Sequence, residues 1–148
     1  MQISRKHMAA PFLAFVVLGL AACGNMMAKK EARLYDRLGG KPAITAVVDD
    51  FVANVAADKR INARFANTDI PRLKRLLVEQ ICHASGGPCT YTGRDMETTH
   101  KGMNITDAEF GYLVEDLVQA LDKHKVPEKE KNDLLTPLGG MKPAIVGK

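Results

Sequence analysis

The sequence is poor in the features that mark several common protein classes. It contains no tryptophan, only 5% of its residues are aromatic, and it has three cysteines among 148 residues. No run rich in lysine or arginine is interleaved with aromatic residues, which argues against a nucleic-acid-binding protein. No long segment alternates between apolar and polar residues, so we expect no sheet. A chain of this length is expected to form one domain.

The first part of the chain has the pattern of a targeting segment. A basic stretch at residues 5–7 precedes an apolar run at residues 9–22, which is too short for a comfortable permanent membrane span. The run ends in "LAAC", residues 20–23, which resembles the lipobox of bacterial lipoproteins, with Cys23 as the lipidated residue. An ordinary secretory signal with a chance cysteine is the alternative.

This resemblance implies both a domain organisation and a location. We expect residues 1–22 to be a lipoprotein signal peptide, residues 23–33 to be a tether, and residues 34–148 to form the folded domain. Gly24 follows the cysteine in place of the aspartate that is associated with retention in the inner membrane. We therefore expect a protein that faces the periplasm and is held by its lipid anchor, on the outer membrane.

The other two cysteines, Cys82 and Cys89, form an even pair for which three states are open. An oxidising compartment favours a disulfide, which would close a short loop. Two free thiols, or a metal site that includes His83, are the alternatives. The C-H-x5-C spacing fits no common zinc module, and it is not the C-x-x-C-H signature of covalent haem attachment. We expect the disulfide.

The rest of the chain predicts an all-α domain of four main helices with short helical pieces. Thr106 and Glu109 form a capping box, which marks a helix start. A short helical piece is expected at residues 95–101, and Pro137 should kink the last helix because it removes a backbone hydrogen bond. Apolar residues recur at helical spacing from Ile44 to Val55, Leu73 to Ile81, Phe110 to Leu121 and Leu134 to Ile145.

One histidine has an unusual position in this pattern. His100 lies on the short helical piece between glycine-containing loops, where it could present its side chain inward. The low aromatic content would suit a core in which a bound planar apolar group supplies the missing volume. From the residues alone, a metal ligand and a solvent-exposed histidine both stay open, and the exposed histidine is favoured. For His83 and His124, which lie near helix ends, a solvated surface position is favoured.

Four segments, in the same order and spacing, resemble the group I truncated hemoglobins. They are "LYDRLGGKPAITAVVDDFV", "RFANTDIPRLK", "GGPCTYTGRDM" and "THKGMNITDAEF". The resemblance runs from about Leu34 to Val146. These proteins are compact globins in which two helices stack on two around haem, so the resemblance implies this fold. It also implies haem b as the cofactor and a diatomic gas (O2, NO or CO) as the ligand.

The resemblance assigns roles to individual residues around the haem. It implies that His100 is the proximal ligand of the haem iron, with its other ring nitrogen oriented by an acceptor. Phe65 would pack on the haem, and Met96 and Tyr91 would pack on its proximal side, although ordinary core or turn residues would look the same. Contacts to the haem propionates are implied for Thr68, Arg72 and Lys74. A solvated helix start is an equal alternative for Lys74.

The distal side departs from the family pattern. Many relatives hold oxygen with a tyrosine and a glutamine, whereas the matching positions are Val52 and Leu77 here, with Leu73 one turn before Leu77. The loss of a hydrogen bond costs dioxygen on the order of 1–2 kcal/mol, which is about tenfold or more in affinity. Gln80, one turn further along, is an alternative donor. Leu76 stands where some relatives supply a sixth iron ligand, and leucine cannot ligate.

The sequence thus predicts a lipid-anchored globin that binds a diatomic gas reversibly in an apolar distal pocket. A nitric oxide dioxygenase is the enzymatic alternative, and it would need an external electron donor because the chain contains no reductase domain. The third alternative is a helical lipoprotein without haem that acts as an interaction module.

Overall fold

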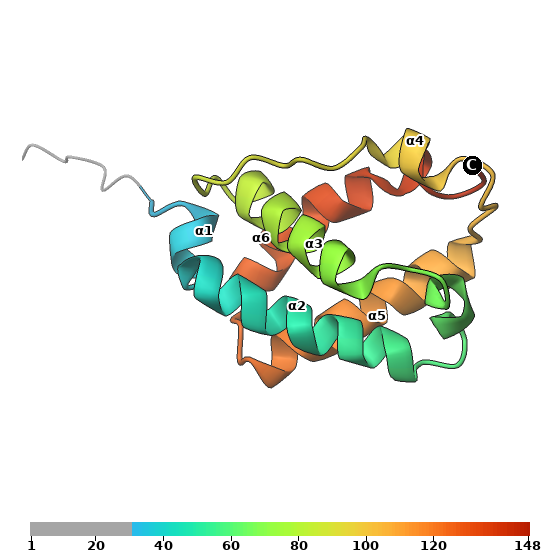
Figure 1. Cartoon of the computed structure of the whole chain (residues 1–148). Helices are drawn as coiled ribbons and strands as arrows, with labels where there is room; N and C mark the ends of the chain where they lie inside the picture. The colour runs from blue at the N-terminus through green and yellow to red at the C-terminus, as the bar shows by residue number, and fades with distance from the viewer. Residues whose placement is uncertain (1–30) are drawn as a thin grey trace, which may run out of the picture. The chain divides into compact units, whose positions relative to one another are not determined.

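The described part of the chain, residues 31–148 of the computed structural model, folds into helices (Figure 1). Those residues contain no strand, and they have one isolated bridge between Ile105 and Val146. The helices are α1 (Leu34–Arg37), α2 (Gly40–Ala57), α3 (Ile70–Ala84), α4 (Met96–His100), α5 (Asp107–Lys123) and α6 (Glu128–Gly140), with 3-10 helices η1 (Asn62–Phe65) and η2 (Lys142–Ala144), and a long loop joins α3 to α4. The predicted signal peptide, Cys23 and most of the tether lie outside the described residues. None of the helices described combines the length and hydrophobicity that a membrane span requires.

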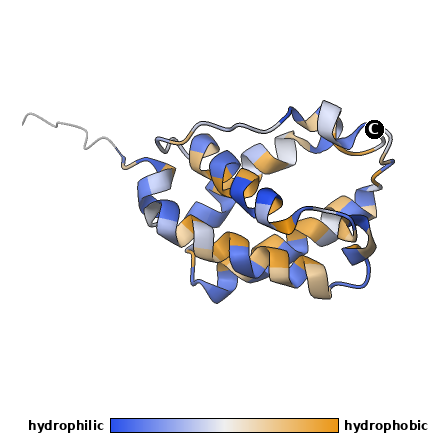
Figure 2. Ribbon diagram, viewed as in Figure 1, coloured by the Kyte–Doolittle hydropathy of each residue, from blue (hydrophilic) through white to orange (hydrophobic). Residues whose placement is uncertain are grey.

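Helix α2 is the centre of the fold, because it packs on both α3 and α5. Apolar residues concentrate along α2 and on the parts of α3 and α5 beside it (Figure 2). Six α2 residues at helical spacing, from Ile44 to Val55, are buried, as expected for one apolar stripe. Together with buried residues of α3, α5 and α6, they form one core.

Local signals in the sequence set the helix starts. The side chain of Asp69 accepts a hydrogen bond from the Arg72 backbone N–H at 3.0 Å, which caps α3. Thr106 and Glu109 form the predicted capping box at the start of α5. The guanidinium of Arg64 binds Glu109 as well, and these contacts lower the pKa of Glu109 to about 2. These two caps define the starts of α3 and α5, the helices that precede and follow α4 in the chain.

The last helix differs from its prediction at its C-terminal end. It runs through Pro137 but ends at Gly140, so the expectation that it continues to Ile145 is wrong. The two glycines at its end disfavour a further helical turn, and Pro143 lacks the N–H that such a turn needs. The chain then forms η2, and Val146 pairs with Ile105. The C-terminal segment is thereby brought next to α4, which packs on η2.

One buried carboxyl group destabilises this fold when it is ionised. Asp116 on α5 is 3% exposed, and its Oδ2 has no hydrogen-bond partner within residues 31–148. Burial, followed by the negative charge of Asp58, raises the pKa of Asp116 above its ordinary value. Because the folded-state pKa lies above the unfolded one, ionisation of Asp116 weakens folding as the pH rises above about 4.

We therefore expect the substitution Asp116→Asn to stabilise the protein. At pH 7 the free energy of unfolding should rise by about 1 kcal/mol, because the amide removes a buried negative charge whose Oδ2 accepts no hydrogen bond within residues 31–148. The gain should disappear as the pH falls toward about 4, where the carboxyl of the unfolded chain is becoming neutral. Urea denaturation at both pH values measures the effect, and Asp49→Asn, at an exposed ion pair, is the control. A variant less stable than the wild type at pH 7 would contradict this account.

Candidate cofactor site

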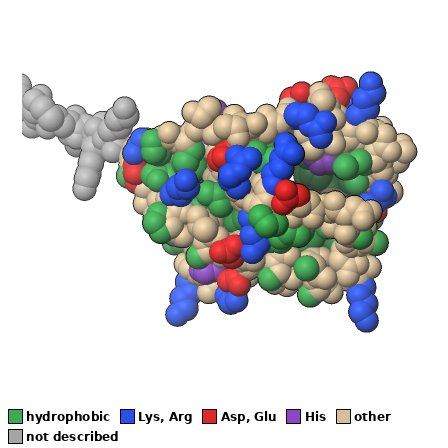
Figure 3. All heavy atoms as spheres, in the orientation of Figure 1, with side chains coloured by type: hydrophobic (Ala, Val, Ile, Leu, Met, Phe, Trp, Pro, Cys, Tyr) green, Lys and Arg blue, Asp and Glu red, His purple; other side chains and the backbone are tan. Residues whose placement is uncertain are grey.

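A large cavity, with a volume of about 430 Å³, lies between α3 and the wall formed by α4 and the C-terminal segment. Helices α2 and α5 close it from the inside. Its mouth is visible in Figure 3 as a hollow with hydrophobic walls and a histidine at its edge. Most of the lining residues are apolar, and the volume is within the range of small-molecule and cofactor sites.

Among the described residues, His100 is the one histidine that lines this cavity. It ends α4, a five-residue helix that the Asp95 side chain caps by accepting from the Thr98 N–H at 2.8 Å. The Nδ1 atom of His100 lies 2.8 Å from the carbonyl oxygen of Met96. A carbonyl can only accept, so Nδ1 carries a proton, and in the neutral ring Nε2 then has the lone pair. The ring is therefore held in the tautomer that can donate to a metal through Nε2.

The cavity wall opposite α4 offers almost no hydrogen-bond donors. Helix α2 contributes Phe51, Val52 and Val55 together with an alanine, all of them apolar. From α3, the lining includes leucines at positions 73, 76 and 77, so no hydroxyl or amide stands at these positions. Gln80 is the one uncharged polar side chain that α2 and α3 place in the cavity.

The charged side chains that line the cavity are two arginines and one carboxylate, Asp69, which caps α3. Arg72 and Arg94 both line it, and neither side chain forms an ion pair within the part of the chain that the structure describes. Thr68 lies beside them in the lining. Lys74 does not line the cavity, because its ammonium pairs with Asp49 on α2 at 2.8 Å. Two such guanidinium groups suit a ligand that carries carboxylates.

A disulfide fixes the loop that leads to the mouth. Cys82 on α3 and Cys89 are joined, with their Cα atoms 5.7 Å apart. Gly87 is needed there, since a Cβ at this position would lie 2.7 Å from the Cys82 Sγ. Further along, the Tyr91 hydroxyl donates to the Arg94 carbonyl oxygen at 2.9 Å, and burial raises the pKa of Tyr91. The loop thus holds Tyr91 and Arg94 at the cavity.

The structure brings most of the residues singled out from the sequence into this one cavity, and Lys74 is the exception. Of the residues singled out, those that line it are Val52, Phe65, Thr68, Arg72, Leu73, Leu76, Leu77, Gln80, Tyr91, Met96 and His100. Sequence reasoning missed the contributions of Arg94, Phe110, Leu113, Leu117 and Met141. Three of these belong to the apolar stripe of α5, which was interpreted as ordinary core, and Arg94 stands in the quoted segment "GGPCTYTGRDM".

These features fit haem, which is a flat apolar ring with two carboxylates and a central iron. The walls are apolar, the arginines lie at the mouth, and one imidazole faces the cavity. Residues 31–148 contain no cluster of three or more His, Cys, Asp or Glu side chains that could hold a metal ion directly. A single imidazole on an apolar cavity suits an iron that is carried within a porphyrin.

Comparison with known proteins agrees with this geometry. Residues 33–146 match the family described as bacterial-like globin. The chain is 37% identical over 116 residues to the group 1 truncated hemoglobin of Mycolicibacterium paratuberculosis, which covers 78% of this chain and 85% of the relative. It is 34% identical over 115 residues to that of Nostoc sp., covering 78% of this chain and 98% of the relative.

Solved structures give the same result. The truncated hemoglobin of Tetrahymena pyriformis in its Fe(III) form superposes with a TM-score of 0.76 and 30% identity, covering 79% of this chain and all of the other. The 2/2 hemoglobin of Synechococcus sp., a protein with covalently attached heme, has a TM-score of 0.69 and 32% identity, covering 73% of this chain and 91% of that one. The chain therefore belongs to the bacterial-like globin family. The similar proteins named above are truncated or 2/2 hemoglobins, and the predicted two-on-two helical fold is confirmed.

Proposed function

We propose that this protein is a haem-binding globin that binds a diatomic gas reversibly. The observation that carries the proposal is His100, whose ring faces an apolar cavity while the Met96 carbonyl fixes its tautomer. Bound haem would supply an iron able to bind O2, NO or CO. We propose haem b, held without a covalent link through cysteine, because Cys82 and Cys89 are joined to each other.

Different residues of the cavity would hold different parts of the haem. His100 would ligate the iron through Nε2, and the half-buried Phe65 and Met96 would exclude water from the ring. Arg72 and Arg94 would bind the propionates through charge-assisted hydrogen bonds. Thr68, also at the mouth, would donate its hydroxyl to the same groups.

The apolar wall sets the preference among gases. Val52, Leu73 and Leu77 offer no N–H or O–H group to a ligand in the cavity. Dioxygen gains most from such a donor, because it acquires partial negative charge as a ligand, whereas carbon monoxide and nitric oxide depend on it less. We therefore propose weak dioxygen binding relative to the other two gases. A catalytic cycle such as nitric oxide dioxygenation would need strong dioxygen binding and an external electron donor, so we favour gas binding over turnover.

We also propose that the protein is a lipoprotein that faces the periplasm, anchored in the outer membrane. The proposal rests on the basic stretch, the apolar run and the "LAAC" segment that ends at Cys23. The described domain lacks any helix suited to span a membrane, so an anchor at Cys23 would be the means of attachment.

Replacing His100 tests the central assignment. Purified wild-type protein should show the intense absorption band of haem, and His100→Ala should lose most of the bound haem or shift the band, because the iron loses its protein ligand. Added imidazole should partly restore the spectrum by ligating the iron in place of the missing side chain. The matched control is His124→Ala, since His124 pairs with Asp50 on the surface and does not line the cavity. A wild-type protein that stays colourless after haem is added would overturn the proposal.

Restoring a donor tests the proposed gas preference. The substitution Leu77→Gln places an amide on the apolar wall, and the dioxygen affinity should rise about tenfold, which corresponds to one new hydrogen bond. The carbon monoxide affinity of the same variant should stay nearly unchanged and serves as the internal control. Gas titration of the ferrous protein measures both. Equal dioxygen affinities for the wild type and the variant would show that Leu77 does not set the preference.

The proposed lipid anchor at Cys23 predicts that the protein is bound to membranes. In a Gram-negative host, the full-length protein should sediment with membranes and require detergent for release. The Cys23→Ser variant should lose the lipid and leave the membrane fraction, because one protein domain without acyl chains has no comparable affinity for the bilayer. Fractionation with metabolic labelling by a fatty acid measures both effects. Unlabelled wild-type protein would contradict the lipoprotein assignment without bearing on haem binding.

A further inference from the structure

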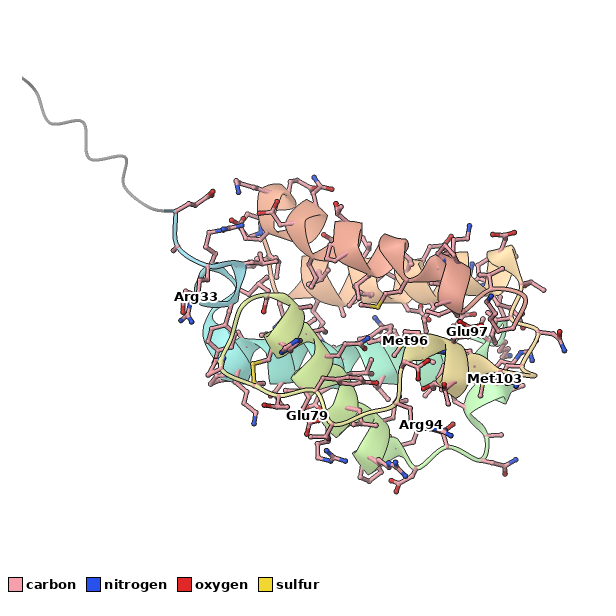
Figure 4. All side chains as sticks on the ribbon, turned by 90° about the horizontal axis from the view of Figure 1, so that it is seen from above. Arg33, Glu79, Arg94, Met96, Glu97 and Met103 are labelled. Carbon is pink, nitrogen blue, oxygen red and sulfur yellow. A yellow bond between two sulfur atoms is a disulfide. The ribbon has the colours of Figure 1, made fainter. Side chains whose placement is uncertain are left out.

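One polar contact joins residues of α3 to residues of the α4 and C-terminal walls of the cavity. The amide nitrogen Nε2 of Gln80 lies 3.4 Å from the sulfur of Met141 and 3.7 Å from the sulfur of Met96. Gln80 belongs to α3, Met96 begins α4, and Met141 directly follows α6. All three side chains line the cavity. Figure 4 shows Met96 at the start of α4, with α3 and α6 on either side of it in that view.

Helix α4 has few other contacts with the rest of the fold: the Asp95 side chain caps it, it packs on η2, and Glu97 pairs with Lys148. A helix of five residues is too short to be stable alone. Its main helix contact is with η2, and it has no comparable packing against α3, from which the cavity separates it. Among the described residues, the Gln80 amide bonds the side chains of Met96 and Met141, whereas Glu79, Arg75 and the disulfide join α3 to the loop before α4.

The contact of Gln80 with Met96 involves the residue whose backbone carbonyl orients His100. Met96 provides the sulfur that faces Gln80, and its backbone carbonyl accepts the hydrogen bond from His100 Nδ1 at 2.8 Å. A displacement of Met96 would therefore displace the acceptor that fixes the imidazole tautomer and direction. Gln80 forms no hydrogen bond with His100 in the described structure, so its effect on the ring passes through Met96.

We propose that Gln80 is a positioning residue: by bonding Met96 and Met141, it holds α4 and the His100 imidazole in place for the haem iron. The inference rests on the proposed function, which supplies the reason for a fixed His100. A thioether is a weak acceptor, so these contacts add to the positioning of α4 without making it rigid. The effect should be local to α4 and not to the fold as a whole.

Amide hydrogen exchange in the haem-free protein tests these contacts of Gln80 directly. In the variant Gln80→Met, which keeps the side-chain length and removes the donor, exchange at Thr99 and Met103 should become about fivefold faster. These amides donate to the carbonyls of Asp95 and His100 within the α4 segment, both at 3.0 Å. The amides of α2 and α5 should exchange as in the wild type. The matched control is Gln119→Met, since Gln119 is exposed on α5.

The rate of haem loss supplies the second readout. Transfer of haem to an excess of a scavenging apoprotein should be about fivefold faster from Gln80→Met than from the wild type, because looser α4 lets the His100 ligand leave more often. In the haem-free protein, the double variant Met96→Leu, Met141→Leu removes both acceptors and should accelerate exchange at Thr99 and Met103 as Gln80→Met does. Adding Gln80→Met to it should then have no further effect, as expected for partners in one contact.

The outcomes separate this inference from the proposed function. Unchanged exchange at α4 and unchanged haem loss in Gln80→Met would overturn the role of Gln80, and so would an equal acceleration at every amide, which would indicate general destabilisation. If the wild-type protein takes up no haem at all, the proposed function fails. The exchange measurement would then still decide whether Gln80 holds α4.

Discussion

The hydrogen bond from His100 Nδ1 to the Met96 carbonyl is the interaction on which the site depends. The bond fixes which ring nitrogen carries the proton and in which direction the ring points. An unrestrained histidine at the end of a five-residue helix could turn toward solvent, and the cavity would then contain no ligand for iron. The cap from Asp95 and the contact of α4 with η2 keep Met96 where its carbonyl can accept this bond.

The cavity itself is a departure from ordinary packing. Protein interiors are close-packed, and a space of this size costs stability because its walls lose contacts. Here the core around α2 is tightly buried, from Ile44 to Val55, while the same helix presents Val52 and Phe51 to the cavity. The cost is understandable if an apolar cofactor completes the core. Arg72 and Arg94 at the mouth, which form no ion pair with residues 31–148, fit the same view, since a bound carboxylate would satisfy both.

The sequence predicts the helices well because their signals are local. Caps, glycine stops and apolar stripes lie within each segment, and they predict the bounds of α2, α3 and α5 to within a few residues. The end of α6 could not be predicted in this way, because apolar residues up to Ile145 continue the spacing although Gly140 ends the helix. Spacing also tells which side of α5 faces inward, but not whether Leu113 meets another side chain or a cavity.

At the site, too, features that depend on contacts between distant segments could not be predicted from local sequence patterns. His100 is favoured as a surface residue until the family resemblance is considered, since no local feature marks a histidine as a ligand. Lys74 follows Leu73 directly on α3, and the helical turn of about 100° per residue directs it away from the cavity and toward Asp49. The contact between Gln80 and Met141 joins residues 61 positions apart, and no local pattern could reveal it.

The most direct test is the resonance Raman spectrum of the ferrous protein without a gas ligand. We expect an iron–histidine stretching band that shifts when the protein is labelled with ¹⁵N-histidine. This band should persist when His83 and His124 are both replaced, because His100 is the sole histidine in the cavity lining that residues 31–148 provide. A five-coordinate haem without such a band, or a band that disappears when His83 or His124 is replaced, would contradict the role given to His100.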